Sequence, residues 1–365
     1  QAMDVLNPED VSLYEDYYNS DGLEEFGLCK KTHVKEFSYL FLPTFYSVTC
    51  ALGIIANLTL VVLLVKYKTL RMVLPLQMVI SDILFTLSLS FWAVYAGSEW
   101  IFGDHSCKAI TFVYMVSLYS SNLFVASLSL QRFLDDARVD STLRIFRSSK
   151  RNGVLCAIVW LFSILAAAVH VSFVELQKFH EKIVCTYHFN DGFGWKVYTR
   201  FQMTLLGFVI PFLVLVFCWI RYCSVVVGRS RFQRFRLETG FTVMFFLLWF
   251  PYSVVIFLHA LQDLHFFYAC TTNIQFDFAI QVTESIAFTH VLVNPLLYMF
   301  LNKKVWKRLR NAFKTPREYL LEESSSSSNG SGQGDDIELK SVQRCQAHDV
   351  NFCAERPNNL LPELK

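Results

Sequence analysis

The stretch CKAITFVYMVSLYSSNLFVASLSLQRFLDDAR, residues 107–138, indicates the class of fold. No side chain between Lys108 and Gln131 is charged, and this run exceeds the roughly 20 residues that a helix needs to cross a hydrocarbon core. Cys107 at one end suits a disulfide on the oxidising side, and Arg132 near the other end can stay hydrated at the membrane rim. The stretch therefore predicts a membrane span whose ends face two compartments.

The composition also indicates a membrane protein. Of the 365 residues, 53% are hydrophobic and 18% are charged, whereas soluble domains carry about 25% charged residues. We find no phosphate-binding glycine loop, no metal-ligand spacing and no nucleophile with a base, so we expect no enzyme. We also expect no nucleic-acid partner, because the basic residues flank membrane spans. A membrane transporter remains a remote alternative, although the two halves of the chain show no repeat.

Seven apolar runs are each long enough to span a membrane. The connections after the first, third and fifth runs are rich in Lys and Arg, and the positive-inside rule places such loops in the cytoplasm. We expect an all-α membrane protein of the plasma membrane, a seven-transmembrane helix bundle with its N-terminus extracellular and its C-terminus cytoplasmic. The runs are 38–65, 73–96, 107–134, 154–174, 201–227, 239–261 and 276–301.

The predicted domain plan is an arm (1–37), the bundle (38–301), a short amphipathic helix on the membrane surface (302–315) and a disordered tail (316–365). Residues 1–28 hold eight acidic side chains and no Lys or Arg, which indicates an acidic extracellular arm. Its candidate sulfation and ligand-binding residues are Tyr14, Tyr17 and Tyr18; the alternative is that these tyrosines are only solvated. Ser324 to Ser328 are candidate phosphorylation sites for receptor kinases and arrestin, and a plain flexible linker is the alternative.

Polar residues inside the spans are candidate functional residues, because they are costly in a membrane. Asp82, Ser121 and Asn294 offer oxygens for a sodium ion; a water-filled polar network without an ion is the open alternative. Glu284 lies about two and a half helical turns from Asn294, towards the predicted outer face, and we expect it to contact a ligand in a cavity.

Span-by-span motifs resemble those of the rhodopsin-like (class A) G-protein-coupled receptors, and within them the chemokine receptors. The resemblance covers about residues 29–315. The general family is indicated by Asn57, Ser81-Asp82, Trp160, Pro211, Trp249-Phe250-Pro251-Tyr252 and Asn294-Pro295-Leu296-Leu297-Tyr298. The chemokine branch is indicated by Phe91-Trp92, Trp100-Ile101-Phe102-Gly103, Tyr114, Glu284 and His290.

The resemblance implies a receptor for a basic secreted chemokine, with roles in chemotaxis and the immune response. It implies that the chemokine docks on the acidic arm and inserts its own N-terminus into the bundle. It also implies two disulfides, Cys107–Cys185 and Cys29–Cys270. The residues it assigns to the ligand pocket are Trp92, Tyr114, Tyr252 and Glu284, and ordinary bundle packing is the alternative for each aromatic.

Departures from the family pattern gather where the third span ends. The family has Asp-Arg-Tyr where this chain has Gln131-Arg132-Phe133, and two carboxylates follow at Asp135 and Asp136. These acids lie three and four residues after Arg132 and could pair with it along a helix. They also occupy the surface on which a G-protein helix inserts, where burying them unpaired is costly. The residues assigned to the G-protein switch are Gln131, Arg132, Phe133, Asp135, Asp136, Trp219, Trp249 and Tyr298, of which Trp219 replaces a tyrosine.

These departures predict altered or reduced G-protein coupling, as in atypical receptors that scavenge chemokine or work through arrestin. The alternative is a conventionally Gi-signalling XC-type (lymphotactin) or CC-type receptor, because Ser117–Ser121 and Ser141–Arg144 resemble the XC-type receptor, which lacks Asp-Arg-Tyr and still signals. Two prolines common in the family are also replaced, by Ser90 in the second span and His170 in the fourth. Both replacements alter the expected shape of the pocket.

Overall fold

The computed structural model describes residues 32–66, 73–136, 141–179, 182–189, 193–223, 229–264 and 270–312. Residues 32–37 of the predicted arm belong to the first helix of the bundle instead. Residues 1–31 of that arm, with Tyr14, Tyr17, Tyr18 and Cys29, and the tail with Ser324 to Ser328 lie outside the described residues. The predictions made for them stay predictions.

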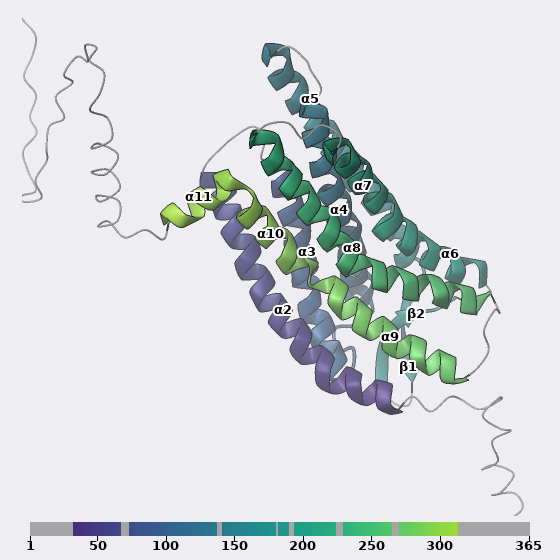
Figure 1. Cartoon of the computed structure of the whole chain (residues 1–365). Helices are drawn as coiled ribbons and strands as arrows, with labels where there is room; N and C mark the ends of the chain where they lie inside the picture. Colours follow the sequence, from purple (N-terminus) through teal and green to yellow (C-terminus); the bar gives the residue numbers. More distant parts are fainter. Residues whose placement is uncertain are drawn as a thin grey trace, which may run out of the picture. The chain divides into compact units, whose positions relative to one another are not determined.

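The seven predicted spans are confirmed as helices long and apolar enough to cross a membrane. They lie side by side as one bundle in Figure 1, and the predicted amphipathic helix follows the seventh span. The helices are α2 (Thr32–Lys66), α3 (Val73–Gly97), α4 (Asp104–Asp136), α5 (Ser141–Val171), α6 (Phe193–Thr204) continued by the π-helical turn η3 (Leu205–Val209) and α7 (Ile210–Cys223), α8 (Arg229–Asp263), α9 (Cys270–Phe288), α10 (His290–Leu301) and α11 (Lys303–Ala312).

A β-hairpin that the sequence analysis did not predict follows the fourth span. Strands β1 (Val174–Phe179) and β2 (Lys182–Tyr187) pair antiparallel, with Leu176 opposite Cys185. Val174, predicted as the last residue of the fourth span, begins β1 instead. We call the end of the bundle that carries this hairpin the hairpin end, and the opposite end, where α11 begins, the α11 end.

The fifth span begins earlier in the chain than predicted. The expected run was 201–227, whereas the span begins at Gly194. Its predicted end at 227 lies outside the described residues. The difference arises because two cations at its start are paired: Lys196 Nζ lies 2.9 Å and Arg200 Nη1 lies 2.7 Å from the carboxylate of Asp263 at the end of α8. A paired charge is tolerated at the end of a membrane-spanning helix. A search for uncharged runs leaves such an end out of the predicted span.

Helix α4 lies at the centre of the bundle. It contacts α3, α5, α7 and β1, and it is the most buried of the seven spans. Several of its serine hydroxyls are satisfied inside the protein: Ser117 Oγ donates to the Val113 carbonyl at 2.6 Å and Ser120 Oγ to Ser81 Oγ at 2.9 Å. These bonds offset the cost of carrying those hydroxyls through the membrane.

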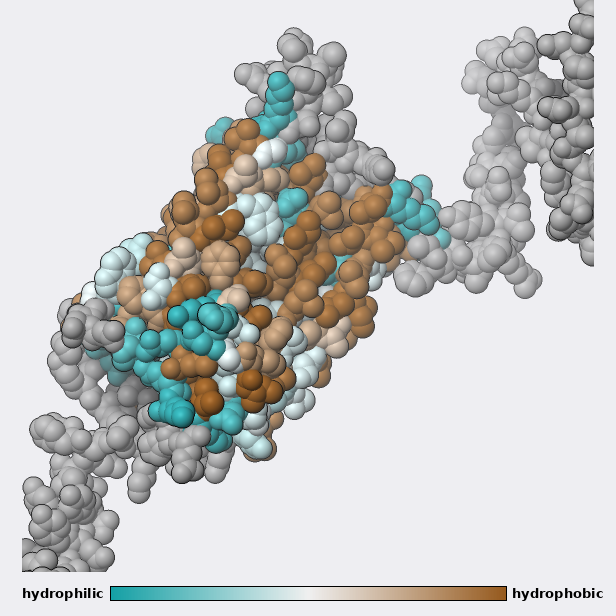
Figure 2. Space-filling view, turned by 180° about the vertical axis from the view of Figure 1, so that it is seen from behind, coloured by the Kyte–Doolittle hydropathy of each residue, from teal (hydrophilic) through white to brown (hydrophobic). Residues whose placement is uncertain are grey.

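The face of the bundle seen in Figure 2 is largely hydrophobic. Leu161 and Leu213, for example, are each 60% exposed. Large apolar side chains exposed on successive turns of long helices are expected where the neighbour is lipid.

Candidate functional site

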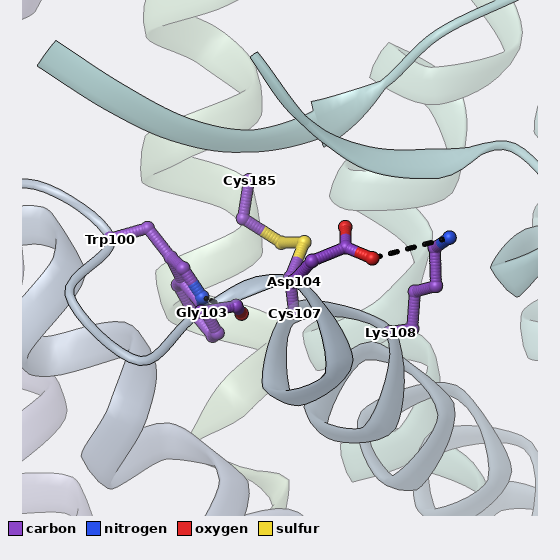
Figure 3. The surroundings of a disulfide bond; sticks show 6 residues. All are labelled: Trp100, Gly103, Asp104, Cys107, Lys108 and Cys185. Carbon is purple, nitrogen blue, oxygen red and sulfur yellow. Dashed lines mark hydrogen bonds and ion pairs between the residues drawn. A yellow bond between two sulfur atoms is a disulfide. The ribbon is translucent and has the colours of Figure 1, made fainter. Parts of the chain in front are cut away.

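A disulfide joins the central helix to the hairpin, as the family resemblance implied. Cys107 of α4 and Cys185 of β2 are bonded with their Cα atoms 5.8 Å apart, within the usual range (Figure 3). Trp100 packs beside this bond and donates from Nε1 to the Gly103 carbonyl at 2.9 Å. Gly103 has φ +85°, a conformation that favours glycine. The hairpin is thereby held against the first residues of α4.

The second predicted disulfide remains a prediction. Cys270 is the first residue of α9, but the structure does not describe its side chain, and Cys29 lies outside the described residues.

A cavity of about 1130 Å³ opens at the hairpin end. All four pocket residues that the resemblance assigned line it, from four different helices: Trp92 of α3, Tyr114 of α4, Tyr252 of α8 and Glu284 of α9. Pockets for small molecules range up to about 1,000 Å³. The cavity is therefore large enough for the end of an extended peptide.

Glu284 gives the cavity its chemical character. Glu284 and Lys182 are the charged residues in its described lining, and the Tyr114 hydroxyl donates to Glu284 Oε1 at 3.4 Å. One hydrogen bond from a neutral phenol is weak compensation for a carboxylate taken out of water. A cationic group of a ligand would supply the missing compensation.

Three residues of the cavity lining each have a polar side-chain atom without a hydrogen-bond partner among the described residues. Trp92 Nε1, Thr111 Oγ1 and Gln281 Oε1 are buried and make no hydrogen bond to any residue that the structure describes. The sequence analysis missed Thr111 and Gln281, because an isolated polar residue in a span gives no sign of the direction it faces. It also missed Tyr187, which lines the cavity from the unpredicted hairpin.

The three residues predicted to form a polar site at mid-bundle lie together. Ser121 Oγ donates to Asp82 Oδ1, and Asn294 Nδ2 lies 3.3 Å from Asp82 Oδ2 and 3.4 Å from Ser121 Oγ. His290 joins them, with Nε2 at 3.8 Å from Asp82 Oδ1. The sequence analysis used His290 only as a family marker, although its position four residues before Asn294 places both on one helix face.

Arg132 is paired with a residue that the sequence analysis missed. Its Nη1 lies 2.5 Å from Oε1 of Glu238, a fully buried residue of α8. The available signal was a single acid, Glu238, at the start of the apolar run of the sixth span. The side chains of Asp135 and Asp136 are not described, so their predicted pairing with Arg132 remains a prediction.

Two of the other predicted switch residues, Phe133 and Trp219, lie at the same end of the bundle as Arg132. Trp219 Nε1 donates to Thr239 Oγ1 of α8 at 3.1 Å, and the ring of Phe133 packs edge-on against Phe217. Gln131, Trp249 and Tyr298 are buried in α4, α8 and α10. Helices α4, α7 and α8 are thus joined at the α11 end by polar and aromatic contacts.

A bundle of seven spans with a cavity at one end fits a membrane receptor, and comparison with known proteins shows that class. Residues 56–298 match the family described as "7 transmembrane receptor (rhodopsin family)". The chain is 33% identical over 312 residues to atypical chemokine receptor 2 of Mus musculus, covering 81% of this chain and 80% of that protein. It is 32% identical over 327 residues to C-C chemokine receptor type 4 of Homo sapiens, covering 86% and 90%. It is also 32% identical over 295 residues to the human C-C chemokine receptor type 1, covering 78% and 82%.

The chain therefore belongs to the rhodopsin family of seven-transmembrane receptors, and within that family to the chemokine receptors. It is a multi-pass protein of the plasma membrane and not an enzyme.

Proposed function

We propose that this receptor binds a basic chemokine at the cell surface and takes the N-terminus of that chemokine into the cavity at the hairpin end. Glu284 carries this proposal, because a partly buried carboxylate in a largely apolar cavity favours a cationic ligand. Thr111 and Gln281 add further polar side chains to the cavity lining. The relatives support the choice of ligand, since each is named as a chemokine receptor.

The proposal places the N-terminus and the hairpin end outside the cell, and the C-terminus inside. Basic connections after the first, third and fifth spans support this orientation. The eight acids of residues 1–28, with Tyr14, Tyr17 and Tyr18 as sulfation candidates, would attract a basic protein and raise its encounter rate. Ser324 to Ser328 would be the phosphorylated segment that arrestin and receptor kinases use.

We further propose that G-protein coupling is reduced, so that the receptor scavenges chemokine or acts through arrestin. The Arg132–Glu238 pair carries this part, because a partner that enters between α4 and α8 must first separate the partly buried charge of Arg132 from the buried charge of Glu238. Gln131, Trp219 and the two acids Asp135 and Asp136 support it. A conventionally Gi-signalling receptor that drives chemotaxis is the second candidate, favoured by the nearly equal identity to C-C receptors.

A binding screen with a parallel signalling measurement tests the proposal. Cells that express the full chain are incubated with a panel of labelled chemokines, and surface binding, uptake and Gi nucleotide exchange are recorded. We expect at least one basic chemokine to bind and be internalised, with exchange at least about fivefold below that of C-C chemokine receptor type 4, a typical allosteric difference. Exchange equal to that of the reference receptor would favour the second candidate, and binding of no chemokine would reject both.

The polar residues at mid-bundle suit a sodium ion, which we propose as a bound cation. The Ala287 carbonyl can only accept a hydrogen bond, so Nδ1 of His290, at 2.9 Å, carries the hydrogen. The remaining lone pair on Nε2 then faces the carboxylate of Asp82. Two acceptors that face each other fit a cation between them, and Asp82 and Ser121 offer oxygen ligands.

Replacing sodium with choline in the assay buffer tests this cation site. We expect the affinity of a bound chemokine to change by about 5-fold or more, as in other coupled sites, and we expect Asp82→Asn to abolish that sensitivity. Ser88→Ala is the control, because Ser88 is a buried serine of the same helix that bonds only to the Phe85 carbonyl among described partners. Equal affinity in both buffers would reject the ion.

A further inference from the structure

A hydrogen-bonded chain of three rings leads from the cavity wall into the middle of the bundle. The hydroxyl of Tyr187, the last residue of β2, lies 3.1 Å from Nδ1 of His170 near the end of α5. On the opposite side of the imidazole, Nε2 lies 2.8 Å from the hydroxyl of Tyr119 in α4. We call these residues the Tyr119–His170–Tyr187 triad. It connects the hairpin, the fourth span and the third span.

Of the three residues, Tyr187 meets the cavity. It is 37% exposed and belongs to the cavity lining. His170 is 1% exposed, Tyr119 is 0% exposed, and neither lines the cavity. A ligand in the cavity can therefore touch Tyr187 directly, and any effect of the other two on ligand binding must pass through neighbouring residues.

Every polar atom of the triad has a partner within it. A neutral imidazole has one donor and one acceptor nitrogen, and a phenol can donate or accept. Partial burial raises the pKa of Tyr187, and the nearby charge of Glu284 raises it further, so the phenol keeps its proton. The tautomer of His170 sets which phenol donates and which accepts. Loss of one member would leave a polar atom unpaired in a buried place.

The triad depends on a residue that departs from the family pattern. His170 stands where chemokine receptors commonly have a proline, and a proline side chain makes no hydrogen bond. The hairpin of this chain is consequently held at two points on β2, by the disulfide at Cys185 and by the hydrogen bond at Tyr187. Both attachments lead to α4, through Cys107 and through Tyr119.

We propose that His170 is a positioning residue for ligand recognition, which holds the Tyr187 phenol in the cavity wall and links it to Tyr119 in α4. A ligand that needs Tyr187 in this position loses affinity when either hydrogen bond of the triad is removed. This holds for the bond between His170 and Tyr119 as well, although neither of these residues lines the cavity. This inference rests on the proposed function, namely that a chemokine enters the cavity.

A double-mutant cycle on the two phenols tests the proposal. Tyr119→Phe, Tyr187→Phe and the double variant each remove hydroxyls with little change in volume. A labelled chemokine that binds the wild type in the panel screen serves as the probe. We expect each single substitution to weaken chemokine binding about 2- to 10-fold, the range of one net hydrogen bond. The double variant should have the same affinity as the single variant that binds less tightly. In a His170→Phe background, neither substitution should weaken binding further.

Tyr198→Phe is the matched control, because Tyr198 lies on the neighbouring helix α6, is 48% exposed and lies outside the triad. It should leave affinity unchanged. The role of His170 would be overturned if Tyr119→Phe left the affinity unchanged. It would also be overturned if the fold-loss of affinity in the double variant equalled the product of the two single fold-losses. If His170→Phe fails to reach the cell surface, the cycle in the native background decides. A wild type that binds no chemokine would instead overturn the proposed function, and the ligand role of His170 with it.

Discussion

Replacing Glu238 with Gln is expected to raise ligand-independent Gi nucleotide exchange at least about fivefold, the lower end of usual allosteric coupling. The substitution removes the charge that holds Arg132 at 2.5 Å but keeps the shape and an oxygen that can accept a hydrogen bond. Truncation would be less informative, because removing one partner of a buried ion pair costs about 3–5 kcal/mol through the uncompensated charge that remains. With glutamine, Arg132 stays hydrogen-bonded but is released more easily towards a partner protein.

The measurement is nucleotide exchange on membranes that contain equal amounts of surface receptor. Thr242→Val serves as the control: Thr242 is a buried residue one helical turn along α8, and its hydroxyl has no hydrogen-bond partner among the described residues. A comparable rise in that control would show a general loosening of α8 and not release of Arg132. If Glu238→Gln leaves exchange unchanged, the block to coupling lies elsewhere, and the acids at Asp135 and Asp136 are the next candidates.

Replacing Glu284 with Gln is expected to weaken binding of a basic chemokine at least about 30-fold. Losing one partner of a buried, hydrogen-bonded charge pair costs about 2 kcal/mol or more, and every 1.4 kcal/mol corresponds to a tenfold change in affinity. Glutamine has almost the same volume and can still accept from the Tyr114 hydroxyl. The loss would therefore report the charge of Glu284 and not a change in the shape of the cavity.

Equilibrium binding of the labelled chemokine to intact cells measures this effect. Glu99→Gln is the matched control, because Glu99 lies at the same end of the bundle and outside the cavity lining, and its carboxylate accepts from the Ile183 amide at 2.8 Å, a contact that glutamine can keep. It should bind chemokine within about twofold of wild type, as expected when no net hydrogen bond is lost. An affinity of Glu284→Gln equal to wild type would remove Glu284 from the ligand site.

The sequence was sufficient to predict the elements that depend on composition along the chain. Long uncharged runs such as that of α4 predicted all seven spans, because a membrane accepts few unpaired polar groups and the length needed to cross it is fixed. Family motifs then predicted the Cys107–Cys185 disulfide. The same reasoning failed for the start of α6, where Lys196 and Arg200 are paired with Asp263 across the bundle. The length of an uncharged run is cut short by those two charges, but it carries no information about the residue that pairs with them.

Residues that act through a partner on another helix were the ones missed. Glu238 and Arg132 are 106 residues apart in the chain, and no local pattern joins them. His170 was noticed as a replaced proline, but its two phenol partners could not be predicted, since one belongs to a hairpin that the sequence analysis did not expect. Asp82, Ser121 and Asn294 were assigned as a set because they are polar residues inside apolar spans, whereas His290 was added by proximity alone.

The amino-acid sequence by itself determined the number of spans, the membrane class and the family of this protein, because these follow from apolar length and from motifs within single segments. The tertiary structure decided which charges are paired, which pocket residues face one cavity, and how the hairpin is tied to α4 through Tyr187 and His170. Those features depend on distances between side chains of different helices, and such distances are set by how the helices pack and not by the order of residues along any one of them.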